Sequence, residues 1–347
     1  MSHERIVTTA RLIHATALAA AFATSASSLA AQEVTLKVHQ FMSDRSVLHT
    51  DVLVPFETAV EEASEGRIDI ELYASMSLGG GAPDLYDQAA DGTVDIILTL
   101  PGYTAGRFNQ AEVFELPFLM GNTVAGSKAF YDYMVSDLQD AEFDETHILS
   151  SWVHSPGQLH SETPITTLDD LAGLEMRGPT RVVTDLLGEL GAIPVGMPLP
   201  LIPENLSKGV ISGAALPWEI TPAIRLAELV DNHTQFPDGT VLYTATFVFA
   251  MNLDVYDDLP DDLRAILDDA TGKAMAELTG TVMVGADTPG RQAASSNTII
   301  TLDETETARW VDAAAPVYDR WVERAAEEGF DGQAVIDQAR ALIDANQ

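Results

Sequence analysis

Short apolar segments with the period of a strand alternate along this chain with segments of helical period. Residues 34–38 alternate apolar and polar side chains, and 94–100 form a nearly continuous apolar run typical of a buried strand. Further strands are predicted at 67–73, 148–153, 174–177, 214–216 and 247–252, and helices at 47–64, 83–91 and 204–208. This alternation predicts an α/β fold with open, largely parallel sheets, which bind ligands at the carboxyl ends of their strands.

The C-terminal third has almost wholly helical periodicity. Residues 261–286 and 303–328 are predicted to form two long amphipathic helices. The whole chain exceeds the usual size of a single hydrophobic core, which favours two lobes. Because no low-complexity tract or run of like charges resembles a flexible linker, we expect the lobes to be closely joined.

One strand, turn and helix carry two arginines close together. Residues 173–177 have the pattern of a short strand, and the apolar positions from Val182 to Leu190 predict a helix with Thr180 as its N-cap. Arg177 would end the strand and Arg181 would lie in the first helical turn, where free N–H groups also favour an anion. Guanidinium groups bind carboxylates with two parallel hydrogen bonds, so this is a candidate carboxylate site. The alternative is that both arginines pair with surface carboxylates.

The charge of the chain excludes several kinds of partner. It has 53 acidic against 18 basic residues and a formal net charge of −35, so nucleic acids and anionic membrane surfaces are not expected to bind. The absence of cysteine excludes disulfides, thiolate metal sites and cysteine nucleophiles. The negative charge of the chain repels small anions at long range, and salt screens charges that are more than about 10 Å apart. An anion site in this protein must therefore act through short, direct contacts.

The N-terminal residues 1–31 have the pattern of a signal peptide. Arg5 and Arg11 precede an apolar run of about a dozen residues, which is too short to span a bilayer. Small residues follow, and we expect cleavage near Ala30 or Ala31 and export to the periplasm. Loss of Glu4 and the two arginines would leave 16 basic and 52 acidic residues.

Seven short motifs in order carry a family resemblance. They are Leu72-Tyr73, Ser77-Leu78-Gly79, Asp91-Gly92-Thr93-Val94-Asp95, Phe114-Glu115-Leu116-Pro117-Phe118, Leu171-Ala172-Gly173-Leu174-Glu175-Met176-Arg177, Gly191-Ala192-Ile193-Pro194-Val195 and Lys208-Gly209-Val210-Ile211-Ser212-Gly213. Together they cover essentially the whole chain after the signal peptide, and the sequence resembles the DctP-type substrate-binding proteins of TRAP (tripartite ATP-independent periplasmic) transporters.

The resemblance implies a periplasmic binding protein fold of type II, with two α/β lobes, a hinge and a long helix that spans both. We assign 32–154 and 242–285 to the first lobe and 155–241 and 286–347 to the second. Such a protein closes around a small organic acid and delivers it to a permease of small and large membrane subunits. Arg177 matches the family's arginine that forms a bidentate salt bridge to the ligand carboxylate. We expect a monomer without metal or cofactor.

Departures from the sialic-acid binders of this family indicate a less polar ligand. The sialic-acid binders have a second pocket arginine at about the position of Gly157 in this chain. They have a pocket acid near the position of Leu100 and an asparagine at that of Leu216. A pocket without these groups would leave the hydroxyls of a sugar acid unpaired, at roughly 1–3 kcal/mol each. We therefore favour an apolar or aromatic monocarboxylate, with sugar acids and dicarboxylates as alternatives.

Candidate contacts around such a ligand are aromatic, apolar and a few polar side chains. The aromatic and apolar candidates are Phe41, Tyr103, Trp152, Leu199 and Trp218; Trp218 would stack on the ligand, while Trp152 is also a plausible core residue. Gln158 could meet a ligand oxygen. Glu219 could accept a hydrogen bond from a ligand hydroxyl or amine, or pair with Arg181.

Other functions have less support in the sequence. No GxSxG, HExxH or GxxxxGK motif is present, and the triple glycine at 79–81 lacks the spacing of a dinucleotide site. A secreted hydrolase acting on small carboxylates is kept as a minor alternative to a binding protein. A sensor that docks to a receptor rather than a permease would have the same sequence features.

Overall fold

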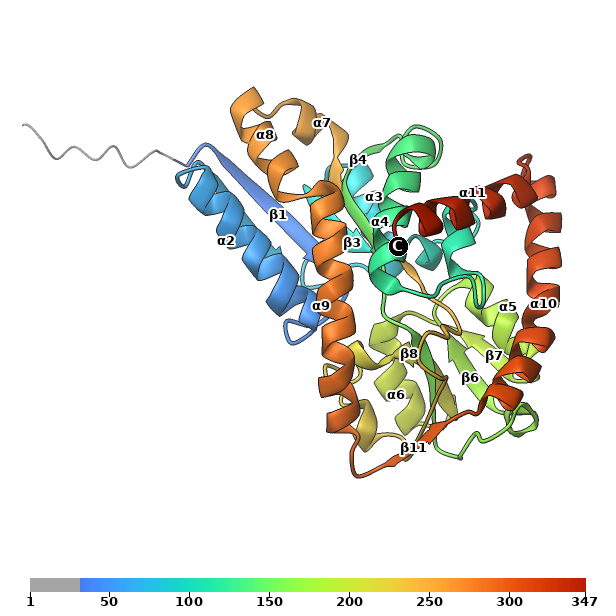
Figure 1. Cartoon of the computed structure of the whole chain (residues 1–347). Coiled ribbons are helices and arrows are strands. Elements are labelled where there is room, and N and C mark those ends of the chain that lie inside the picture. The colour runs from blue at the N-terminus through green and yellow to red at the C-terminus, as the bar shows by residue number, and fades with distance from the viewer. Residues whose placement is uncertain (1–31) are drawn as a thin grey trace, which may run out of the picture.

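The computed structural model describes residues 32–347, and the predicted signal peptide lies outside this range. The described chain forms two β-sheets with helices around them (Figure 1). The first sheet has the order β2-β1-β3-β10-β4, and the second has the order β11-β9-β5-β8-β6-β7. The α/β prediction is therefore confirmed.

The first sheet is parallel except for one strand. β1, β2, β3 and β4 share one direction, while β10 runs antiparallel between β3 and β4. The bounds are β1 (Val34–Gln40), β2 (Ile68–Tyr73), β3 (Ile96–Thr99), β4 (Thr146–Val153) and β10 (Thr246–Asn252). The carboxyl ends of four strands and the amino end of β10 consequently meet at one edge.

The second sheet is also parallel except for one strand, β5. β7, β6 and β8 are parallel, β5 is antiparallel to both β8 and β9, and β11 runs parallel to β9. The bounds are β5 (Gly157–Ser161), β6 (Glu175–Gly178), β7 (Ile193–Gly196), β8 (Gly213–Pro217), β9 (Asn232–Gln235) and β11 (Thr298–Thr301).

Ten α-helices pack around the sheets of the described chain. They are α2 (Val54–Ala63), α3 (Leu85–Ala90), α4 (Thr123–Tyr133), α5 (Arg181–Glu189), α6 (Ile202–Ser207), α7 (Leu253–Asp257), α8 (Asp261–Ala270), α9 (Gly272–Ala293), α10 (Glu304–Glu327) and α11 (Gly332–Ala345). The predicted helix at 261–286 is interrupted, because Thr271 leaves the helical conformation with φ −123° and ψ −142°, and Gly272, which begins α9, has a φ of 68°. No helix in the range 32–347 has the length and apolar character needed to cross a membrane.

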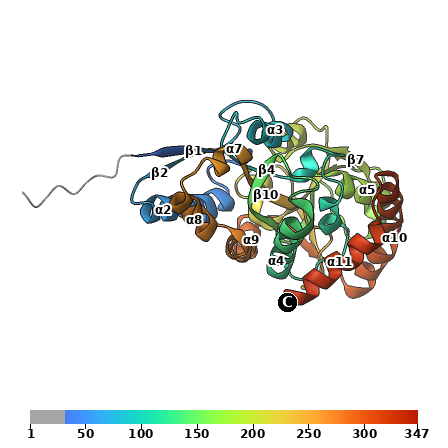
Figure 2. The ribbon, with the colours of Figure 1, turned by 90° about the horizontal axis from the view of Figure 1, so that it is seen from above.

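Three segments connect the two sheets. The chain passes from β4 to β5 through 154–156, returns from β9 to β10 through 236–245, and crosses again in α9, which contacts β4 and the 3₁₀ turn Trp218–Ile220 (Figure 1). Seen from above, α10 lies along α5 while α11 returns to α4 (Figure 2). The last helix, α11, therefore contacts α4, which packs on β4 of the first sheet. The domain boundaries expected from the sequence assign α11 to the second lobe.

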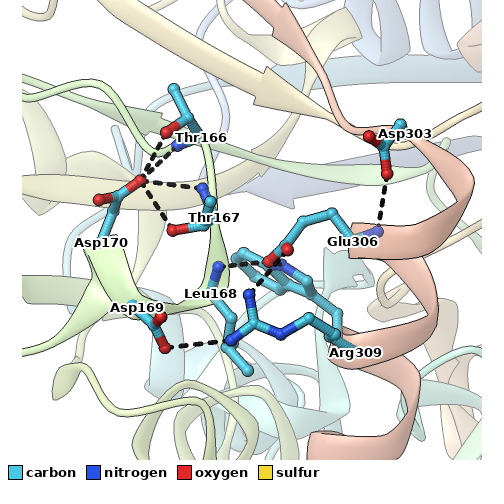
Figure 3. Close-up of polar contacts among 9 residues, drawn as sticks. Thr166, Thr167, Leu168, Asp169, Asp170, Asp303, Glu306 and Arg309 are labelled. Atoms are coloured by element: carbon cyan, nitrogen blue, oxygen red, sulfur yellow. Dashed lines mark hydrogen bonds and ion pairs between the residues drawn. The ribbon is translucent and has the colours of Figure 1, made fainter.

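Hydrogen bonds and an ion pair join the start of α10 to the segment that precedes β6 (Figure 3). Asp303 caps the helix by accepting a hydrogen bond from Glu306 N at 2.8 Å. The Glu306 carboxylate accepts from Leu168 N at 2.6 Å, and Arg309 pairs with Asp169 at 3.2 Å. These contacts hold the start of α10 against the 3₁₀ turn Leu168–Leu171.

Candidate functional site

A small cavity, with room of about 40 Å³, lies where the carboxyl ends of strands from both sheets face each other. Its lining comes from the carboxyl ends of β1, β3, β4, β6 and β8 and the residues that follow them, and from the start of β10. Leu199, which follows β7, completes the lining. The lining residues are Phe41, Met42, Leu100, Tyr103, His154, Arg177, Pro179, Leu199, Leu216, Pro217, Glu219, Ile220, Tyr243, Ala245 and Phe247.

Arg177 on β6 is the cationic group of this cavity. Its side chain is only 2% exposed, and it donates from Nε to Met197 O and from Nη1 to Ala215 O, both at 2.9 Å. Within residues 32–347 no carboxylate forms an ion pair with it, and burial lowers the pKa of its guanidinium. A buried charge without a counter-ion is costly, and the remaining N–H donors of the guanidinium are available to an anion from outside the chain.

Two tyrosine hydroxyls flank the guanidinium. Tyr103 Oη accepts a hydrogen bond from Leu199 N at 3.1 Å, which leaves its own proton free to donate. Tyr243 Oη has no hydrogen-bond partner within the described chain. Burial raises the pKa of both hydroxyls while the Arg177 charge opposes the shift, so both stay protonated and can donate to a bound carboxylate.

The position of Tyr243 depends on a glycine. A Cβ placed on Gly157 would lie 2.1 Å from the Tyr243 ring, which no real contact allows. Gly157 is about the position where the sequence comparison above expects a second arginine in the sialic-acid binders. The absence of a side chain there is what admits the tyrosine ring into this part of the cavity.

The rest of the cavity is apolar and aromatic. Phe41 meets Tyr103 edge to face, with ring centroids 5.2 Å apart, and stacks on Phe247 at 6.3 Å. Leu100 and Leu216, singled out as apolar replacements, both line the wall. His154 contributes only a neutral ring, because burial lowers its pKa to about 4 and both nitrogens are bound to backbone groups of Ser155 and Ala245.

Glu219 is the only acidic side chain among the residues that line the cavity. It is 6% exposed, and its Oε2 has no hydrogen-bond partner among the residues described. Burial, reinforced by the nearby charge of Asp287 on α9, raises its pKa well above the ordinary value for glutamate. Burial therefore favours the protonated form of this side chain, which can donate one hydrogen bond and accept others.

Five of the nine predicted contacts line the cavity together: Phe41, Tyr103, Arg177, Leu199 and Glu219. Three others are packed elsewhere. Trp218 turns away from the cavity and packs on His160 with ring centroids 4.9 Å apart, so the predicted stacking on a ligand does not fit this position. Trp152 lies behind Phe247, and the side chain of Gln158 is held by Pro156 O and Phe236 N.

Arg181 lies outside the cavity and has partners of its own. Its Nε and Nη2 each donate to the Glu112 carboxylate at 3.0 Å, and Nη2 also donates to Asn109 Oδ1 at 2.7 Å. Glu112 is 4% exposed and precedes β4, so this ion pair joins the segments of the two sheets. The suggested pairing of Arg181 with Glu219 is therefore wrong, because Glu112 occupies its fork of donors.

The sequence analysis missed several lining residues, most of them on connections. Tyr243 and Ala245 lie on the crossing before β10, which has no periodicity to mark it. Met42 and Ile220 follow strand ends that were predicted, so their places could have been found from the rule on carboxyl ends. Across the described residues no cluster of three or more histidine or acidic side chains could hold a metal ion.

Two sheets with a cavity at their junction define the class of two-lobed solute-binding proteins. Residues 38–325 match the family model DctP, bacterial extracellular solute-binding protein, family 7. This chain belongs to that family, the solute-binding proteins of TRAP transporters.

Solved structures of the family are similar over nearly the whole chain. A TRAP solute-binding protein from Rhodoferax ferrireducens T118, in complex with copurified benzoate, is 49% identical with a TM-score of 0.88, over 90% of this chain and 98% of that one. A marine metagenome TRAP protein specific for aromatic acid ligands, co-crystallised with 3-hydroxybenzoate, is 38% identical with a TM-score of 0.88, over 91% and 99%. The C4-dicarboxylate-binding periplasmic protein DctP of Rhodobacter capsulatus is 25% identical over 284 residues, 79% of this chain and 82% of that protein.

Proposed function

We propose that this protein captures a small aromatic or apolar monocarboxylate in the periplasm and delivers it to a TRAP permease of small and large membrane subunits. The observation that carries the proposal is the buried Arg177, which has no carboxylate partner in the described chain and faces an otherwise apolar, aromatic cavity. A ligand carboxylate would form a bidentate pair with the guanidinium, strengthened by the exclusion of water. The similar proteins described with benzoate and 3-hydroxybenzoate support this ligand class.

Dicarboxylates and sugar acids fit the cavity less well. Arg177 is the only cationic side chain of the lining, so a second carboxylate would be buried without a partner. A sugar acid has several hydroxyls, while the lining offers Tyr103, Tyr243 and Glu219 as its main polar side chains. The contacts we propose are Phe41, Tyr103, Arg177, Leu199 and Glu219, joined by Tyr243 and Phe247.

Binding without chemistry is the favoured mode of action. Among the lining residues there is no serine, cysteine, threonine or lysine, and both nitrogens of His154 are occupied by backbone groups. A hydrolase would need an activated nucleophile with an adjacent base at the ligand, and no hydrogen bond between described residues joins Glu219 or the hydroxyl of Tyr243 to such a base. We infer a monomeric binding protein, exported after cleavage near Ala30 or Ala31, whose lobes have the boundaries predicted above and close on the ligand.

A thermal-shift screen of the mature protein tests this function. Ligand at a hundred times its dissociation constant stabilises the folded state by about 2.7 kcal/mol. We expect shifts with aromatic and apolar monocarboxylates and none with sugar acids or dicarboxylates. Shifts confined to sugar acids would refute the proposed ligand class, and release of a converted product would favour the hydrolase. Transport and sensing are separated by uptake assays in cells with and without the permease subunits.

A further inference from the structure

Among its polar side chains the cavity has one cation and one acid. They are the Arg177 guanidinium and the Glu219 carboxyl, both in the lining. A guanidinium beside a carboxyl would lower its pKa, whereas the pKa of Glu219 is raised by burial and by Asp287. No ion pair joins Glu219 to Arg177 within the described residues, so a ligand held by Arg177 meets Glu219 with another part of its structure.

Glu219 is buried, unpartnered and rigidly placed. Its neighbour Trp218 is fixed by a hydrogen bond from Nε1 to Gln235 at 3.2 Å and by packing against His160 and His233. On the other side, α9 lies so close that a Cβ on Gly290 would be 2.2 Å from Trp218 O. A side chain placed by such a frame has little freedom to turn away and find water.

We propose that Glu219 is a specificity-determining residue that recognises a hydroxyl group on the ring of the ligand, so that hydroxylated aromatic monocarboxylates are preferred over unsubstituted ones. This inference rests on the proposed function. The carboxyl of Glu219 lines the cavity with an unpartnered Oε2, which can accept the proton of a ligand hydroxyl, and in its protonated form the carboxyl can also donate to the hydroxyl oxygen. An unsubstituted ring would leave the buried Oε2 unpaired, and sites built to bind a hydroxyl discriminate strongly against ligands that lack it.

The test compares affinities by titration calorimetry for benzoate and for 2-, 3- and 4-hydroxybenzoate. In the parent protein at least one hydroxybenzoate should bind about tenfold or more tightly than benzoate. Glu219→Leu should reduce this ratio to about threefold or less, whereas Glu219→Gln, which can still donate and accept, should keep most of it. Glu228→Leu is the matched control, because Glu228 is an exposed acid that pairs with Arg225 outside the cavity.

The possible results separate this inference from the proposed function. Equal binding of benzoate and all hydroxybenzoates by the parent would overturn the inference while leaving the function intact. An undiminished preference in Glu219→Leu would also overturn it. If the leucine variant does not fold, the parent's ratio and the glutamine variant still decide. Failure of the parent to bind any of the four acids would refute the proposed function itself.

Discussion

Arg177 holds a full positive charge where no carboxylate of the described chain compensates it. Two backbone carbonyls, Met197 O and Ala215 O, orient the guanidinium and leave its other donors for a ligand. Such an arrangement lowers the stability of the empty protein in favour of binding, because a ligand anion removes an unfavourable burial of charge.

Replacement of Arg177 should therefore abolish or severely weaken binding. We expect Arg177→Ala to weaken the affinity for an aromatic acid by about 2–5 kcal/mol, and Arg177→Lys to restore little, because an ammonium cannot form the two parallel bonds. Calorimetric titration measures both. Parent-like affinity in either variant would show that the carboxylate binds elsewhere.

At the scale of elements, strands β5 and β9 are joined by an unusual buried pair, His160 and His233. Their Nδ1 atoms are 2.7 Å apart, and His160 Nε2 lies 3.1 Å from Leu216 O. His160 must then carry its proton on Nε2, so His233 donates from Nδ1 and accepts from Asn297 at Nε2. Both rings are neutral, with pKa values lowered by burial to about 3 and about 4.

This pair should make the protein sensitive to acid. An unfolded histidine binds its proton near pH 6.5, whereas the folded rings resist it down to about 3 and 4, so the pair loses stability as pH falls through this window. Relative to the parent, the variant His160→Gln/His233→Gln should gain in free energy of unfolding between pH 6.5 and 4.5. Comparison with the parent cancels the effect of the buried carboxyls.

Urea titrations over this pH range measure the difference. His49→Gln is the control, since the His49 ring is only partly buried and should change the pH slope less. Identical pH dependence of parent and double variant would mean that the histidines are not neutral partners.

The sequence predicted the elements whose side chains alternate or repeat, and missed those stabilised by particular partners. Strands β1, β2, β3 and β10 were found close to their observed bounds. β5 and β9 are buried although rich in polar residues, because side-chain pairs such as that of the two histidines satisfy them, and periodicity cannot reveal such partners. β11 is largely exposed and so lacks an apolar pattern.

The same reason explains which of the predicted contacts line the cavity and which are packed elsewhere. Arg177 was found because its strand, turn and helix are contiguous in sequence. Trp218 was misplaced because the chain turns after β8, so that Pro217 and Glu219 face the cavity while the intervening side chain faces the sheet. The glutamate pairing with Arg181 could not be chosen among 53 acidic residues without the fold.

For the whole molecule, the ion pair of Arg181 with Glu112 and Asn109 is a contact between segments of the two sheets. We predict that Arg181→Ala affects affinity less than Arg177→Ala and acts mainly by speeding ligand release, by roughly tenfold or less, because a contact between the lobes is lost. Stopped-flow dissociation measures the rate. Glu112→Gln/Arg181→Ala should be more stable than Arg181→Ala alone, which leaves a buried carboxylate unpaired. A loss of affinity as large as that of Arg177→Ala would place Arg181 at the ligand instead.

The excess of acidic residues leads to a further prediction. With a net charge of −35, repulsion within the folded state should fall as salt screens it, so the unfolding temperature should rise between low salt and about 0.3 M NaCl. Sucrose at equal osmolality is the control for general solute effects. An unfolding temperature that falls or stays constant over this range would contradict the prediction.

The contact between Gly157 and Tyr243 limits how this pocket could change by mutation. Any side chain at 157 requires the tyrosine ring to leave first, because a single Cβ already overlaps it. A change toward a second arginine would therefore pass through an intermediate with a smaller residue at 243, in which neither hydroxyl nor guanidinium is present. The substitution at 243 must come before the substitution at 157 for the pocket to accept a different class of ligand. Single substitutions that accumulate at random are therefore expected to retain the existing ligand class.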